Sequence, residues 1–306
     1  MGAYLFTGCS PRGGLSRLGA VTQELDANRG GYDGSWPDEA RVDVRTDEPA
    51  TPVVNSFTEW ECLEEVIVGR ADHACVPQWH LTLEATLPRR YWPFFKTHGG
   101  QPFAPELLTA AAAELDELSR VLEAEGVVVR RPDAVDWSRP IETPAFRAAS
   151  GLYGAMPRDC LLVIGNEIIE APMAWRCRYL ETRAFRALIR NYFRQGARWT
   201  AAPKPELEDS LYRSELAGSE FDVNRDRSAV TEDEPVFDAA DFCRIGRDIF
   251  CQLSHVTNRF GVAWLRRHLG EEFRIHVLQF NDPNAMHMTR RSCRWRPLVC
   301  WSIRSA

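Results

Sequence analysis

Leu63-Glu64-Glu65-Val66-Ile67-Val68-Gly69 is an apolar run with β-branched residues that ends in glycine. Such a run predicts a buried strand. The stretch 105–125 then predicts an amphipathic helix, because four of its leucines fall on one stripe: Leu108, Leu115, Leu118 and Leu122. Gly126 can take the left-handed conformation that ends a helix, and 127–129 is a second apolar strand. The unit is therefore strand, helix, glycine and strand.

This unit recurs twice along the chain. The second copy has strands at 161–164 and 168–169, a helix at 176–194, Gly196 and a strand at 198–199. In the third copy, a strand at 248–252 and a helix at 255–268 precede Gly270 and a strand at 273–278. A unit that cannot bury its own apolar face must pack on its neighbours. The repeat therefore predicts an α/β solenoid or closed ring.

The composition is that of a globular protein with a sizeable core. The 306 residues are 44% hydrophobic and 26% charged, with a formal net charge of -6. The acidic balance argues against a nucleic-acid partner, and no apolar run reaches the about 20 residues that span a membrane. We therefore expect a cytoplasmic protein that binds neither nucleic acid nor membrane.

Three stretches differ in composition. Residues 1–54 are rich in Gly, Pro, Asp and Arg, and we expect them to form a poorly ordered extension. The folded domain is expected over 55–288, whereas 289–306 holds five arginines and no acid and continues no repeat. Nine scattered cysteines without a C-x-x-C pair predict reduced thiols, and neither they nor the histidines have metal-ligand spacing.

Four side chains could carry chemistry from their positions alone. Asp238 and Asp241 lie in a predicted loop, where a carboxylate could orient a histidine or bind a cation; the alternative is a turn cap. His287 follows a turn-rich segment and could transfer protons, or it is an ordinary surface residue. Asp159 precedes an apolar strand and could bind a guanidinium bidentately; the alternative is an ion pair with Arg158.

Nine segments, in this order, make the chain resemble the amidinotransferase family over about 55–288, and within it the arginine:glycine amidinotransferases. The segments are Leu63-Glu64-Glu65-Val66-Ile67-Val68-Gly69-Arg70, Ala74-Cys75-Val76-Pro77, Tyr91-Trp92-Pro93-Phe94, Val129-Arg130-Arg131-Pro132, Met156-Pro157-Arg158-Asp159, Gly165-Asn166-Glu167-Ile168-Ile169-Glu170-Ala171-Pro172-Met173-Ala174-Trp175-Arg176, Ala202-Pro203-Lys204-Pro205, Phe237-Asp238-Ala239-Ala240-Asp241-Phe242 and Asp282-Pro283-Asn284-Ala285-Met286-His287.

The resemblance implies a pentein fold, a ring of five α/β modules, of which this chain would hold about three and a half. It also implies transfer of the amidino group of L-arginine to an acceptor amine, glycine first, through a covalent amidino-cysteine intermediate and without metal or organic cofactor. Asp238 would orient His287, the general acid and base, whereas Asp159 and Asn284 would contact the substrate. Relatives are dimeric, so a homodimer is expected at full length.

Two departures from the family pattern concern the chemistry. Thr289 stands where the family has a second guanidinium-binding aspartate, and the glycine-rich Phe-His-Cys motif of the nucleophile is absent. Cys293 and Cys300 have no matching surroundings. The chain as written is therefore expected to be inactive, and the alternative function is a non-catalytic binder of guanidino compounds. A hydrolase such as an arginine deiminase is a third possibility, which the long motifs disfavour.

The tail suggests a cause for these departures. If one base is inserted before the Thr289 codon, permitted codons for 289–306 can be read as a peptide beginning Asp-Ala-Thr-Phe-Val-Pro. That peptide resembles the family's continuation and restores the missing aspartate. Our hypothesis is a one-base deletion or sequence error after Met288.

Overall fold

The computed structural model describes residues 3–6, 52–218, 228–278 and 286–288. Within this part of the chain, three sheets share one plan: a central strand pairs antiparallel with one neighbour and parallel with the other. The sheets are β1 (Ala3–Phe6), β2 (Glu65–Val68) and β3 (Val128–Arg130); β6 (Leu161–Ile164), β7 (Glu167–Glu170) and β8 (Arg198–Ala201); and β9 (Phe242–Ile245), β10 (Asp248–Gln252) and β11 (Arg274–Leu278).

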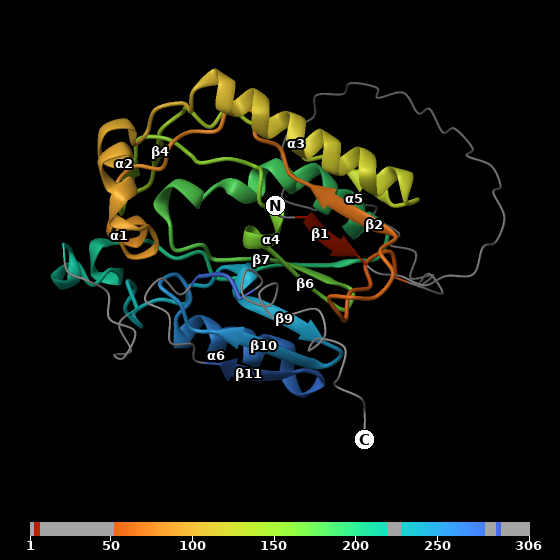
Figure 1. The fold of residues 1–306 in the computed structure, drawn as a ribbon. Helices are drawn as coiled ribbons and strands as arrows, with labels where there is room; N and C mark the ends of the chain where they lie inside the picture. The colour runs from red at the N-terminus through yellow and green to blue at the C-terminus, as the bar shows by residue number, and fades with distance from the viewer. Residues whose placement is uncertain (1–2, 7–51, 219–227, 279–285, 289–306) are drawn as a thin grey trace, which may run out of the picture.

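A helix links the two parallel strands of each sheet, because parallel neighbours need a crossover. These helices are α3 (Pro105–Ala124), α5 (Arg186–Arg194) and α6 (Arg259–Leu269). In Figure 1, α3 covers the module of β2 at the top of the view, and α6 lies against the blue sheet of β9, β10 and β11 at the bottom. The sheet of β6 and β7 lies between them.

Shorter elements fill the connections. They are the helices α1 (Leu81–Thr86), α2 (Trp92–His98) and α4 (Pro157–Cys160), the hairpin of β4 (Ile141–Glu142) and β5 (Arg147–Ala148), and the 3₁₀ turns η1 (Arg89–Tyr91), η2 (Arg176–Arg178), η3 (Glu181–Phe185), η4 (Asp209–Leu211), η5 (Ser214–Leu216), η6 (Ala239–Asp241) and η7 (Gly270–Glu272). Among the described residues, no helix is long and apolar enough to cross a membrane.

The repeat predicted from the sequence is confirmed, with differences at three places. The stretch 176–194 is helical only from Arg186, since 3₁₀ turns precede it and bury Arg178 and Glu181. The helix predicted from 255 begins at Arg259, because the Asn258 side chain accepts the Gly261 N–H and caps it. The predicted loop around 242 includes strand β9, which pairs with β10.

One strand lies in the N-terminal stretch, and several residues singled out near the other end fall outside the described part of the chain. Ala3–Phe6 forms β1 within the stretch that was predicted to be poorly ordered, and its main chain pairs with the edge of β2, whose N–H and C=O groups would otherwise lack partners there. Asn284, Thr289, Cys293 and Cys300, together with the tail 289–306, lie outside the described residues.

A continuous core joins the second and third modules. Apolar side chains of β6 and β7 pack with Phe185 and Ile189 near α5, and with Ile249 of β10 and Leu265 of α6. All of these are buried. Because one core spans both sheets, the loops between the modules are held at fixed distances from each other.

Candidate active site

The structure brings together three of the four predicted site residues. His287 Nε2 lies 3.0 Å from Asp238 Oδ2, and His287 Nδ1 lies 3.6 Å from Asp159 Oδ1. The exposed fractions are 8% for His287, 1% for Asp238 and 6% for Asp159. A histidine thus lies between two almost completely buried carboxylates.

Each carboxylate is placed by a loop that follows from the local sequence. Pro157 begins the one-turn helix α4, which presents Asp159 directly before the buried strand β6. Asp238 precedes η6, and its backbone N–H donates to the hydroxyl of Thr257 at 3.1 Å. Asp238 makes no capping bond with its side chain, so the carboxylate is left for His287.

Asp241, the neighbouring candidate, contacts the backbone of His287. Its carboxylate accepts the His287 backbone N–H at 2.7 Å, and it also accepts hydrogen bonds from Gln252, Ser254 and Thr257. His287 has a φ of 59°, a left-handed conformation that is costly for a side chain other than glycine. Asp241 therefore stabilises the strained backbone that directs the imidazole between Asp159 and Asp238.

The structure pairs Asp159 with Arg178, 19 positions further along the chain. Arg158 donates to the carbonyl of Ala239 at 2.6 Å and lies 3.4 Å from Glu59. Asp159 instead accepts a hydrogen bond at 3.0 Å from Arg178, which the sequence analysis did not single out. Asp159 Oδ1 is left facing His287 at a distance too long for a strong hydrogen bond.

Arg178 and Glu181 are the residues that sequence reasoning missed. Arg178 Nη1 lies 3.0 Å from Asp159 Oδ2 and 3.6 Å from Asp238 Oδ2, and its Nε donates to Glu181 Oε2 at 2.8 Å. Both residues are fully buried. Two opposite charges three positions apart in an otherwise amphipathic stretch were the available signal, but such a pair is commonly a surface pair.

Burial and charge shift the pKa values of this cluster. Burial opposes charging of His287, but the carboxylates of Asp159 and Asp238 outweigh it and raise the pKa of His287. Burial raises the pKa of Asp238 despite the hydrogen bond from His287 and the charge of Arg178. Burial also raises the pKa of Glu181 to about 7. His287, Asp238 and Glu181 therefore all bind their protons more tightly than the same groups do in water.

Two buried thiols neighbour the cluster in sequence: Cys160 directly follows Asp159, and Cys177 directly precedes Arg178. Burial raises the pKa of Cys177 to about 12 and that of Cys160 well above its usual value. A thiol attacks as its thiolate, so neither is suited as a nucleophile. The described part of the chain holds no group of three or more His, Cys, Asp or Glu side chains that could bind a metal ion.

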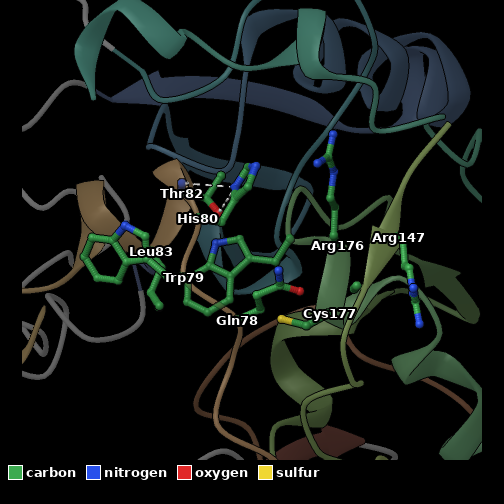
Figure 2. Close-up of a pocket in the computed structure, with 10 residues that line it drawn as sticks. Gln78, Trp79, His80, Thr82, Leu83, Arg147, Arg176 and Cys177 are labelled. Carbon is green, nitrogen blue, oxygen red and sulfur yellow. Dashed lines mark hydrogen bonds between the residues drawn. The ribbon is translucent and has the colours of Figure 1, made fainter. Parts of the chain in front are cut away.

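A separate pocket lies beside the hairpin of β4 and β5, and Figure 2 shows its lining. Trp79, His80, Arg147 and Arg176 line it, and none of the predicted site residues does. Burial, together with the charge of Arg176, lowers the pKa of His80 to about 4, so this imidazole is neutral and caps α1. The pocket is therefore distinct from the acidic cluster.

The acidic cluster supports two kinds of chemistry. Its carboxylates suit a planar cation such as a guanidinium, which pairs with carboxylate oxygens through directed N–H bonds. An imidazole held by a carboxylate suits proton transfer. The geometry therefore indicates a site for proton-coupled reactions on a cationic substrate.

No protein-family model matches the chain, but whole-chain comparisons find relatives. The chain is 51% identical over 240 residues to the mitochondrial glycine amidinotransferase of Danio rerio, covering 77% of this chain and 57% of that protein. It is 49% identical over 238 residues to the L-arginine:L-lysine amidinotransferase of Pseudomonas savastanoi pv. phaseolicola, covering 78% and 65%. The chain thus spans less than two thirds of the length of these relatives.

Solved structures agree with this result. An amidinotransferase of Microseira wollei from the saxitoxin biosynthetic pathway superposes with a TM-score of 0.69 at 50% identity, covering 76% of this chain and 64% of that one. The inosamine-phosphate amidinotransferase of Streptomyces griseus gives 0.66 at 36% identity, covering 74% and 62%. The predicted pentein fold is thereby confirmed.

The comparisons correct one expectation. We expected a cytoplasmic protein from the acidic composition and from the lack of an apolar run long enough to span a membrane. The vertebrate relatives, including those of Danio rerio and Gallus gallus, are named mitochondrial, which contradicts a cytoplasmic assignment. Composition and net charge do not indicate the cellular compartment in which a folded protein resides.

Proposed function

Because the chain belongs to the amidinotransferase family, we propose that it binds L-arginine through the guanidinium and forms the binding and proton-transfer part of an amidino-transfer site. The observation that carries this proposal is the position of His287 between Asp159 and Asp238. Resemblance supplies the reaction class, and the geometry supplies the groups that bind a cation and transfer a proton.

In this proposal Asp159 binds the substrate guanidinium. Its Oδ2 accepts a hydrogen bond from Arg178, whereas Oδ1 faces His287 Nδ1 at 3.6 Å. A guanidinium N–H directed at Oδ1 would form a charge-assisted bond and orient the guanidino carbon for attack. We expect Asn284, three positions before His287 in the sequence, to contact the same substrate.

His287 transfers the proton in both halves of the reaction. A cysteine thiolate bonds to the guanidino carbon, the bond from that carbon to the δ-nitrogen breaks, and His287 gives ornithine its proton. The acceptor amine then bonds to the same carbon, its proton passes to His287, and the carbon–sulfur bond breaks to return the thiolate. Asp238 stabilises the imidazolium in each half through the 3.0 Å contact.

For the chain as given we propose binding without turnover. The described thiols nearest the cluster have raised pKa values, and no cysteine lies in a motif of the expected kind. For the full-length protein we propose glycine as the acceptor, with ornithine and guanidinoacetate as products, and a homodimer. Names of relatives support glycine and also lysine as acceptors, and we choose glycine from the overall likeness of the sequence.

Calorimetric titration with L-arginine, followed by an assay for ornithine and guanidinoacetate in the presence of glycine, tests the proposal. We expect the 306-residue chain to bind arginine without releasing ornithine. Expression of the gene with one base inserted after the Met288 codon is expected to restore ornithine release. If the repaired gene yields binding but no transfer, a non-catalytic guanidino-binding protein is the better account. If neither form binds arginine, the proposal is wrong.

A further inference from the structure

Arg178 and His287 both contact the same two carboxylates, those of Asp159 and Asp238. Arg178 Nη1 is 3.0 Å from Asp159 and 3.6 Å from Asp238, and the two imidazole nitrogens are 3.6 Å and 3.0 Å from the same residues. Charges of opposite sign therefore alternate around a closed set of four side chains. Arg178 and His287 both contact each carboxylate, which restricts the orientation of its oxygens toward a substrate.

Arg178 is itself fixed from behind. Its Nε donates to Glu181 at 2.8 Å, its Nη2 lies 2.7 Å from the same carboxylate, and the ring of Tyr153 lies 5.5 Å from its guanidinium carbon. Arg178 and Glu181 are 2% and 1% exposed. Such an arginine cannot turn toward solvent, so its side chain is a rigid part of the site.

Electrostatics explain why a fixed cation is needed here. Asp238 and Glu181 are both buried, and burial of a carboxylate favours its protonated form. Asp241, which faces His287 from η6, adds a further acid. The charge of Arg178 lowers the pKa values of Asp238 and Glu181 against the effect of burial.

We infer that Arg178 is a positioning residue that orients Asp159 for the substrate guanidinium and Asp238 for His287. Glu181 completes the device as the counter-ion that holds Arg178 in place. The inference deepens the proposed function and rests on it. Arg178 contacts no reacting atom, so its effect passes through the two aspartates.

The pKa of His287 in the free 306-residue chain, measured by NMR over a pH series, tests the inference. Arg178→Gln removes a cation that contacts both carboxylates, so we expect the pKa of His287 to rise by about one pH unit. Glu181→Gln removes a carboxyl group that ionises at about pH 7 beside Arg178, so the pKa of His287 is expected to fall by a smaller amount. Arg178→Lys keeps the charge and should leave the pKa of His287 near the wild-type value, while arginine binding weakens about tenfold because the directed hydrogen bonds are lost.

Arg194→Gln, an exposed substitution on α5, is the matched control and is expected to change neither quantity. The inference is overturned if Arg178→Gln and Glu181→Gln shift the pKa of His287 in the same direction, or if neither shifts it. Loss of packing alone would not shift this pKa in opposite directions in the two variants. If Arg178→Gln does not fold, Arg178→Lys and Glu181→Gln still decide the question. The pKa readout needs no arginine, so failure of the proposed function alone would leave these shifts in place.

Discussion

Glu181 is a buried acid whose protonation affects the stability of the whole protein. Burial raises its pKa from 4.5 to about 7 in the folded protein. Between these two values the folded state holds a proton that the unfolded state has lost. The free energy of unfolding is therefore expected to fall as the pH rises from about 5 to about 7.

Urea denaturation of the wild-type chain and of Glu181→Gln at a series of pH values measures this contribution. The amide introduced by this substitution has no proton to lose in that pH range, so the variant should lose part of the slope. Glu117→Gln, on the exposed face of α3, is the control and should keep the wild-type slope. Equal slopes in the wild type and Glu181→Gln would show that another group causes the pH dependence.

At the scale of residues, sequence reasoning reached part of the site. Asp159, Asp238 and His287 were identifiable because the resemblance placed them in motifs of known order. Arg178 and Glu181 were not, because their function depends on being buried against segments about 20 and 60 residues away in the chain. The sequence does not show whether a charged residue in an amphipathic stretch is exposed or buried.

Gly69 ends β2 where another segment of main chain passes very close. A Cβ atom at this position would lie 2.2 Å from the carbonyl oxygen of Ala155, which cannot move without shifting the backbone. Gly126 after α3 has a φ of 84° and no atom within 4 Å of such a Cβ. The two glycines are therefore required for different reasons, close approach at Gly69 and backbone conformation at Gly126.

Gly69→Ala is expected to destabilise the protein by about 3 kcal/mol, since overpacking against rigid main chain forces strain into the first module. Gly126→Ala, the matched control, should cost about 1 kcal/mol from the left-handed backbone alone. Urea denaturation monitored by circular dichroism gives both values. A smaller cost at Gly69 than at Gly126 would contradict the close approach of the two segments.

The elements themselves were predicted well where periodicity was long. α3 and the strands β6, β7, β10 and β11 lie within a few residues of the predicted bounds. β9 was missed because its four residues follow the acidic turn at Asp238 and give no sustained alternation. The helix predicted from 176 was too long, because side-chain pairing in the interior overrides helical periodicity there.

On the scale of the whole molecule, a buried polar contact joins the second and third modules. Glu167 on β7 is 2% exposed, and its carboxylate lies 2.8 Å from His268 Nε2 at the end of α6. Trp264 stacks on the same imidazole at 5.2 Å. Because Glu167 depends on a residue from another module, loss of that residue should loosen the packing between the two sheets.

His268→Ala is expected to lower the free energy of unfolding by about 1–3 kcal/mol, because it removes a hydrogen-bond partner from a buried carboxylate. His276→Ala, whose histidine pairs with the more exposed Asp248 on the same sheet, is the control and should have a smaller effect. Differential scanning calorimetry measures both. Equal effects would mean that the contact between the modules contributes little.

The repeat and the order of units were visible in the sequence because each unit has the same apolar pattern and ends its helix with glycine. The arrangement that creates the site was not visible from patterns alone. It requires that α4, η2 and η6 meet, and these are short segments without periodicity of their own. Resemblance to a known family supplied that information where periodicity could not.

The most direct measurement is calorimetric titration of the 306-residue chain with L-arginine and with L-citrulline, which has the same shape but a neutral ureido group. The site should bind arginine and fail to bind citrulline at comparable concentrations, because its carboxylates attract a cation. Asp159→Asn should weaken arginine binding by about tenfold or more, whereas the exposed Asp233→Asn should not change it. Equal affinity for arginine and citrulline, or full arginine binding by Asp159→Asn, would contradict the assignment of this cluster as a guanidinium site.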